Sequence, residues 1–190
     1  LYKILGEESD SLGVAGAAGV VVEASTGRIM AMVSYPGIDS NIFSSGVDGE
    51  FFNTLLQDRR NPFLDKAISV QASPGSSFKL ITAYTLLENN YIDENTRFFS
   101  NRFIDLGGGG PFCEYGKLFY GDMNVVRALY KSSNLFFCTN LLGFTRGEGN
   151  FNKFIDAAKQ FNIGSKTGVD LVGEVSGNID SPEVRFEKTG

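Results

Sequence analysis

The stretch SPGSSFKLITAYTLLENN, residues 73–90, places a serine three residues before a lysine at the start of an expected helix. Pro74-Gly75 is a typical entry signal, and apolar and threonine side chains then recur at helical spacing. Residues three apart on a helix share one face, so Ser76 and Lys79 can approach within hydrogen-bond distance. The stretch predicts a helix over residues 76–90 that presents both side chains together.

A serine hydroxyl is a weak nucleophile until a base accepts its proton. The chain has no histidine, which excludes Ser-His-Asp and Cys-His catalysis within it and disfavours a zinc site. A lysine buried against apolar side chains shifts toward the neutral amine, because burial disfavours the charged form. The start of a helix also offers free N–H groups that favour an oxyanion near Ser76. Lys79 is therefore the expected general base for Ser76.

The Ser-x-x-Lys pattern alone is weak evidence, since a chain of this composition contains about one such match by chance. In the simpler alternative, Ser76 caps the helix and Lys79 is solvated. The segment YKSSNLFF, residues 130–137, favours catalysis, because Ser132 and Asn134 lie at a break between two helical patterns. A hydroxyl there could relay a proton, and an amide could orient a substrate or the lysine.

Composition narrows the class of protein. The chain has 190 residues, 42% of them hydrophobic, and a net charge of −5. It has no basic run, which argues against a nucleic-acid partner, and no apolar run near the roughly 20 residues that cross a bilayer. Cys113 and Cys138 lack metal-ligand spacing and are expected as free, buried thiols, while a disulfide would need an oxidising compartment.

Alternating patterns predict a mixed architecture. GVVVEASTGRIMAMVS, residues 19–34, predicts two strands joined by a tight turn, with apolar residues on both faces and hence cover, at least in part, on both sides. Helices are expected over residues 48–58, after an Asp122 cap, over 135–144 and from 151 to about 164. The expected class is α/β of the α+β type, a mostly antiparallel sheet with helices packed on it.

Four segments, taken in order, carry a family resemblance: GVVVEASTGRIMAMVSYPGID, SPGSSFK, YKSSN and IGSKTGVDLVGEVSG. They resemble the transpeptidase domain of class B penicillin-binding proteins, whose nucleophile motif is usually P-G-S-T-F-K, with Ser77 here in place of threonine. S-x-x-K, S-D-N and K-T-G are the motif set of these proteins and of class A β-lactamases. The resemblance implies a central antiparallel sheet flanked by helices, residues 1–190 as part of that domain, and residues 1–15 as a linker or edge segment.

The resemblance also implies roles for individual residues. Ser76 would attack the D-Ala-D-Ala carbonyl of a peptidoglycan stem peptide, and Lys79 would activate it. Ser132 would pass the proton toward the leaving D-alanine, and Asn134 would bind the acyl-side amide. β-Lactams would acylate the same serine, and no metal or organic cofactor is implied. Other cell-wall elongation proteins are expected partners. The resemblance also implies a location on the extracytoplasmic (periplasmic) side of the inner membrane. An N-terminal helix outside this chain would anchor the protein there.

This chain departs from the family pattern at the third motif, which in the family is a Lys-Thr-Gly strand beside the nucleophile. Lys166-Thr167-Gly168 lies in a segment that is not the catalytic strand in the family, and Lys188-Thr189-Gly190 ends the chain. We expect both to be coincidental and the residues 1–190 alone to react poorly. The alternative, that 188–190 is the true motif, stays open.

Two other functions stay open at this stage. A serine β-lactamase or β-lactam sensor would use the same Ser76–Lys79 pair, and the persistence of the acyl-enzyme would distinguish it. A catalytically silent module of penicillin-binding type, holding cell-wall partners, would not be labelled by a β-lactam at all.

Overall fold

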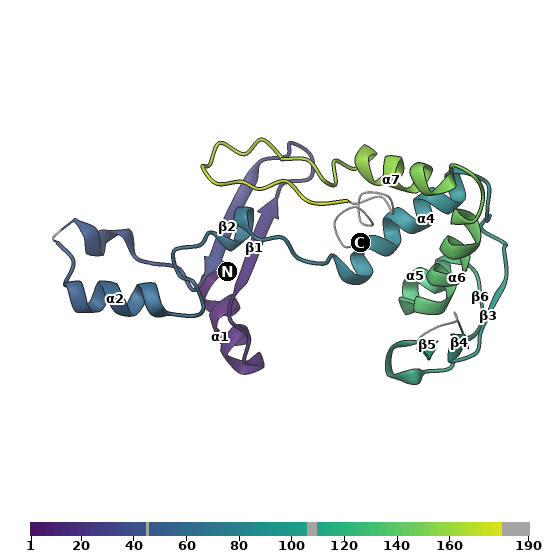
Figure 1. Ribbon diagram of the computed structural model, residues 1–190, viewed down its shortest axis with the longest axis horizontal. Helices are drawn as coiled ribbons and strands as arrows, with labels where there is room; N and C mark the ends of the chain where they lie inside the picture. The colour runs from purple at the N-terminus through teal and green to yellow at the C-terminus, as the bar shows by residue number, and fades with distance from the viewer. Residues whose placement is uncertain (45, 106–109, 180–190) are drawn as a thin grey trace, which may run out of the picture. The chain divides into compact units, whose positions relative to one another are not determined.

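The computed structural model describes residues 1–44, 46–105 and 110–179. By their contacts they form two compact units (Figure 1). The first unit is Leu1–Ala72 with Gly168–Val175, and the second is Ser73–Thr167 with the segment from Ser176.

The first unit is built on an antiparallel hairpin of β1 (Ala17–Val22) and β2 (Ile29–Tyr35), as the sequence predicts. Helices α1 (Tyr2–Leu12) and α3 (Lys66–Ser69) pack against both strands. The rings of Tyr2 and Tyr35 meet edge to face, with centroids 5.3 Å apart. Residues 1–15, expected as a linker or edge segment, thus contain a helix that belongs to this unit.

The cover of the hairpin by its own unit is partial. Several apolar side chains of the hairpin remain 45–64% exposed: Val20, Val21, Val22, Ile29 and Met30. Two helices, α1 and the four-residue α3, supply the packing of β1 and β2 in the described part of the unit. The two short helices thus shield only part of the two-stranded sheet, which agrees with an expected cover that is at least partial.

The rest of the first unit is a capped helix and a returning segment. Helix α2 (Gly49–Gln57) begins after Asp48, whose carboxylate accepts the N–H groups of the first turn, which confirms the helix predicted over 48–58. A 3₁₀ turn, η1 (Ser40–Phe43), precedes it. The segment Gly168–Val175 joins α3 through the Ser69 hydroxyl, which donates to the Gly173 carbonyl at 2.8 Å.

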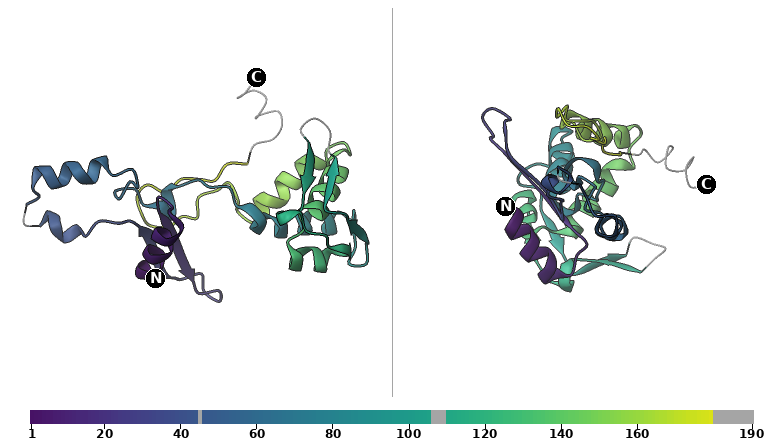
Figure 2. Two further views of the ribbon diagram at one scale, coloured as in Figure 1. Left: turned by 90° about the horizontal axis from the view of Figure 1, so that it is seen from below. Right: turned by 90° about the vertical axis from the view of Figure 1, so that its left-hand side faces the viewer.

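In the described residues of the second unit, α-helices pack with short antiparallel ladders (Figure 2). The helices are α4 (Lys79–Glu88), α5 (Val125–Lys131), α6 (Asn134–Thr145) and α7 (Asn150–Gln160). The ladders pair β3 (Phe98–Ser100) with β6 (Gly121–Met123) and β4 (Phe103–Asp105) with β5 (Pro111–Cys113), both antiparallel. Helices and antiparallel ladders in one chain confirm the expected α+β class.

The core of the second unit lies where α4, α5 and α6 meet. Its buried members are Ala83, Leu86, Ile92, Met123, Val125, Ala128, Phe136, Phe137 and Phe144. Helix α6 is apolar around most of its circumference, as a central helix must be. Because α4 packs on both α6 and α7, the first turn of α4 has a fixed relation to the start of α6.

One predicted cap is wrong. Asp122 does not cap α5: it lies in β6, opposite Phe99. The strand continues to the fully buried Met123, so Asn124 is the first residue free to cap, and its side-chain oxygen accepts the Arg127 N–H at 3.0 Å.

Among the described helices, none combines the length and apolar content that a bilayer crossing needs.

Candidate active site

The predicted nucleophile and base lie on one continuous helical run. Ser76 is in the 3₁₀ turn η2 (Gly75–Phe78), which passes directly into α4 at Lys79. The Lys79 backbone N–H donates to the carbonyls of Ser76 and Ser77, and the Ser77 hydroxyl donates to the Pro74 carbonyl. Ser76 is exposed and caps neither helix, which contradicts the simple N-cap alternative.

Ser132, Ser133 and Asn134 form the junction between α5 and α6. Ser132 ends α5 in the left-handed backbone region, with φ 51° and ψ 44°. Ser133 caps α6, and its hydroxyl oxygen accepts the Phe136 N–H at 3.1 Å. This confirms the predicted break between two helices, and it leaves the Ser132 side chain exposed beside a buried cap.

Lys79 meets this junction directly. Its Nζ lies 2.5 Å from the Ser132 carbonyl oxygen, 3.0 Å from Ser132 Oγ and 2.7 Å from Asn134 Oδ1. The Asn134 amide nitrogen is directed away, toward the Cys113 carbonyl at 3.4 Å. The packing of α4 on α6 thus brings three of the four predicted site residues together across more than 50 positions.

The environment of Lys79 suits a base. The pKa of Lys79 is lowered from the usual 10.5, chiefly because burial disfavours the ammonium, while the negative charge of Glu114 acts in the opposite direction. Two of its partners, the Ser132 carbonyl and Asn134 Oδ1, can only accept hydrogen bonds. A neutral amine could donate its two hydrogens to them and direct its lone pair at a hydroxyl.

The sequence-based expectations for the site are met in part. Lys79 is half-buried rather than mostly buried, and its amine contacts Ser132 and Asn134. The lowered pKa agrees with the expected direction, and the ion pairs found among the described residues do not include Lys79. The roles expected of Ser132 and Asn134 also predict that both lie within a few ångströms of the Ser76 hydroxyl, and this stays a prediction.

Glu114 also belongs to this site, although no sequence pattern indicates it. This carboxylate, only 2% exposed, accepts hydrogen bonds from Ser100 Oγ, Ser133 Oγ and the Asn134 backbone N–H. A single acidic residue in an aromatic, irregular stretch has no periodicity that could reveal its burial, and its partners come from two segments distant in the sequence, at Ser100 and at Ser133–Asn134.

Of the two Lys-Thr-Gly triplets, residues 166–168 lie within the described part of the chain. Residues 166–168 belong to no helix or strand, so they do not form an edge strand, as expected. Residues 188–190 lie outside the described residues.

Cys113 and Cys138 are free thiols, each partly buried. In the described part of the chain, no three His, Cys, Asp or Glu side chains gather as metal ligands would.

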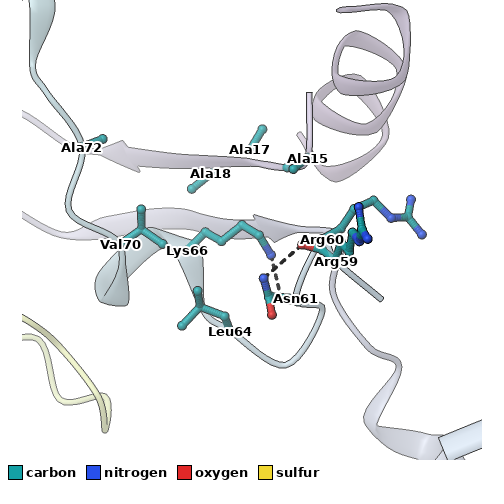
Figure 3. A pocket seen from close by; sticks show the side chains of 11 residues that line it. Ala15, Ala17, Ala18, Arg59, Arg60, Asn61, Leu64, Lys66, Val70 and Ala72 are labelled. Atoms are coloured by element: carbon teal, nitrogen blue, oxygen red, sulfur yellow. Dashed lines mark hydrogen bonds between the residues drawn. The ribbon is translucent and has the colours of Figure 1, made fainter. Parts of the chain in front are cut away.

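A separate pocket of about 390 Å³ opens beside β1 in the first unit. Figure 3 shows Arg59, Arg60 and Lys66 among its lining residues, with the Lys66 amine donating to the Asn61 carbonyl at 2.9 Å. Burial lowers the pKa of Lys66. None of the predicted catalytic residues lines this pocket.

Comparisons with known proteins agree with this geometry. Peptidoglycan D,D-transpeptidase MrdA of Escherichia coli K12 is 31% identical over 176 residues, which cover 90% of this chain and 27% of that protein. MrdA of Acinetobacter baumannii is 29% identical over 165 residues, 86% of this chain and 24% of that protein. The chain therefore spans about a quarter of the length of the curated relatives that it matches.

A solved structure and a family model agree with these relatives. The complex between penicillin-binding protein PBP2 and MreC from Helicobacter pylori matches with a TM-score of 0.82 at 28% identity, over 98% of this chain and 34% of that one. The model of the penicillin binding protein transpeptidase domain matches residues 17–189. The chain belongs to the penicillin-binding protein transpeptidase family.

Proposed function

We propose that the protein is a serine-type peptidoglycan D,D-transpeptidase that cross-links stem peptides through an acyl-enzyme on Ser76. The observation that carries this proposal is the Lys79 amine, held between Ser132 and Asn134 one helical turn from Ser76. Family membership supports the same reaction. A lysine base explains how a serine can be activated in a chain without histidine.

The proposed reaction has two half-steps. In the first, Ser76 Oγ forms a bond to the carbonyl carbon of the penultimate D-alanine as its proton passes to neutral Lys79. The C–N bond to the terminal D-alanine then breaks, and the proton reaches that nitrogen through Ser132. In the second, the amine of a neighbouring stem peptide attacks the ester, the C–O bond breaks and Ser76 regains a proton.

Asn134 has two roles in this proposal. Its Oδ1 holds the Lys79 amine at 2.7 Å, and its amide N–H₂ retains a hydrogen for the acyl-side amide of the substrate. The backbone N–H of Ser76 would supply one donor to the tetrahedral oxyanion, and the third motif of the family would supply the other.

Substrates, partners and location follow as further proposals. Stem peptides that end in D-Ala-D-Ala are the substrates, and β-lactams acylate Ser76 as mimics of them. A PBP2 that this chain resembles was solved in complex with MreC, which supports a cell-wall elongation protein as partner. Since peptidoglycan lies outside the cytoplasm, we place the protein on the extracytoplasmic side of the membrane.

Intact-protein mass spectrometry of the complete gene product after incubation with a β-lactam tests the proposal. We expect a stoichiometric adduct on Ser76 that persists for longer than the assay. Rapid loss of the adduct would indicate a β-lactamase instead. An adduct that survives Ser76→Ala, or no adduct at all, would refute the catalytic assignment, and the latter would favour a silent binding module.

A further inference from the structure

Glu114 is a buried acid beside the candidate active site. It follows β5 and is only 2% exposed, and its backbone N–H donates to the Arg102 carbonyl at 2.9 Å. A carboxylate removed from water is costly unless hydrogen bonds compensate its oxygens. Its partners should therefore reveal what it stabilises.

Three donors converge on this carboxylate. Oε1 accepts from the hydroxyls of Ser100, at 2.8 Å, and Ser133, at 2.5 Å. Oε2 accepts the Asn134 backbone N–H at 2.6 Å. Hydrogen bonds to a charged acceptor are the stronger kind, and this one lies at the N-terminus of the twelve-residue α6, where negative charge is favourable.

Ser133 and Asn134, which Glu114 holds, lie next to or among the groups that contact the Lys79 amine. Ser132 has a positive φ, which is unfavourable for a residue with a side chain and persists where the surroundings fix it. On one side, Ser132 N–H and Ser133 N–H bond back into α5. On the other side, Glu114 fixes Ser133 and Asn134. The carbonyl and hydroxyl of Ser132 and the Oδ1 of Asn134 are thereby aimed at the Lys79 amine.

Glu114 also acts on Lys79 through its charge. Among the described residues, the charge of Glu114 raises the pKa of the Lys79 amine, against the larger lowering of that pKa by burial. The groups that touch the amine, from Ser132 and Asn134, are neutral. Geometry and charge therefore connect the same carboxylate to the base.

We propose that Glu114 is a positioning residue for the Lys79 base: it locks the Ser132–Asn134 junction that holds the amine, without touching the substrate. This inference rests on the proposed function of the same site. It assigns to a buried acid, outside the three sequence motifs of the family, the placement of the base that accepts the Ser76 proton; the charge of the same acid raises the Lys79 pKa against the larger effect of burial.

The central test is Glu114→Gln in the complete gene product, with the acylation rate constant for a fluorescent penicillin measured against pH. We expect the rate to fall about 10- to 100-fold, as for a small misplacement of a catalytic group. We also expect the acid limb of the profile to move to lower pH, because the charge that raises the Lys79 pKa is lost.

Ser100→Ala is the matched control. It removes one hydrogen bond from the same carboxylate but keeps the charge and the Asn134 contact. It should lower stability without moving the acid limb. Glu114→Asp should keep the limb near its wild-type position while the rate still falls, and it replaces the glutamine variant if that variant does not fold.

An NMR titration of the Lys79 side-chain amine separates this proposal from the function on which it rests. If the wild type is not acylated at Ser76, the proposed function fails, yet the Lys79 pKa should still fall in Glu114→Gln. A folded Glu114→Gln with an unchanged rate profile and an unchanged Lys79 pKa would overturn the positioning role. An acid limb that moves as far in Ser100→Ala as in Glu114→Gln would also overturn the positioning role.

Discussion

The Lys79 Nζ lies 2.7 Å from the Asn134 Oδ1, although 55 positions separate the two residues in the sequence. The same amine also contacts both oxygens of Ser132. Three experiments test whether this cluster holds a catalytic base or is an ordinary polar contact between two helices, and a fourth tests the burial of the helix that carries Lys79.

Ser76→Ala should abolish labelling by a fluorescent penicillin, because no other group in the proposal forms the ester. Ser77→Ala is the matched control on the same 3₁₀ turn, and it loses only an exposed hydrogen bond to the Pro74 carbonyl. That variant should label at close to the wild-type rate. If both variants lose labelling equally, the turn rather than the Ser76 hydroxyl is what matters.

Lys79→Met keeps the length and apolar stem of the side chain but removes the amine. The acylation rate should fall by about 10²–10⁴, the usual contribution of a general base. Stopped-flow labelling measures it, and circular dichroism checks that the helical content is retained. A folded variant that is acylated at the wild-type rate would exclude Lys79 as the base.

The acylation rate should rise with pH through the pKa of Lys79, because the neutral amine is the active form. Burial lowers that pKa below the usual 10.5, so the acid limb should lie below the range of an exposed lysine. Asn134→Asp places a carboxylate against the amine, which favours the ammonium. We expect this variant to move the limb to higher pH and to react more slowly at neutral pH; a limb at the same pH would contradict the assignment to Lys79.

Leu86→Ala should destabilise the second unit by about 2–5 kcal/mol, because Leu86 is fully buried on the helix that carries Lys79. Leu80→Ala on the same helix is the control: Leu80 is 63% exposed, and its loss should change stability by no more than about 0.5 kcal/mol. Urea denaturation of the complete gene product, followed by circular dichroism, measures both. Equal effects would contradict the described burial of α4.

The sequence by itself determined the local features of the protein. The hairpin, the helices predicted at 48–58 and 135–144, the Pro74-Gly75 entry and the break at Ser132–Asn134 all follow from periodicity and turn chemistry. These signals act over a few residues, so a single sequence contains them. The family resemblance also came from short motifs in a fixed order.

Only the tertiary structure decided which groups meet. The Lys79 contacts depend on how α4 packs against α6, a long-range packing that local periodicity does not specify. Glu114 has no pattern around it, and its burial appears only when Ser100, Ser133 and Asn134 converge. Asn124 caps α5 in place of the predicted Asp122, because the buried Met123 extends β6 by one residue past Asp122. In each case the free energy of packing side chains distant in sequence, rather than local preference, fixed the result.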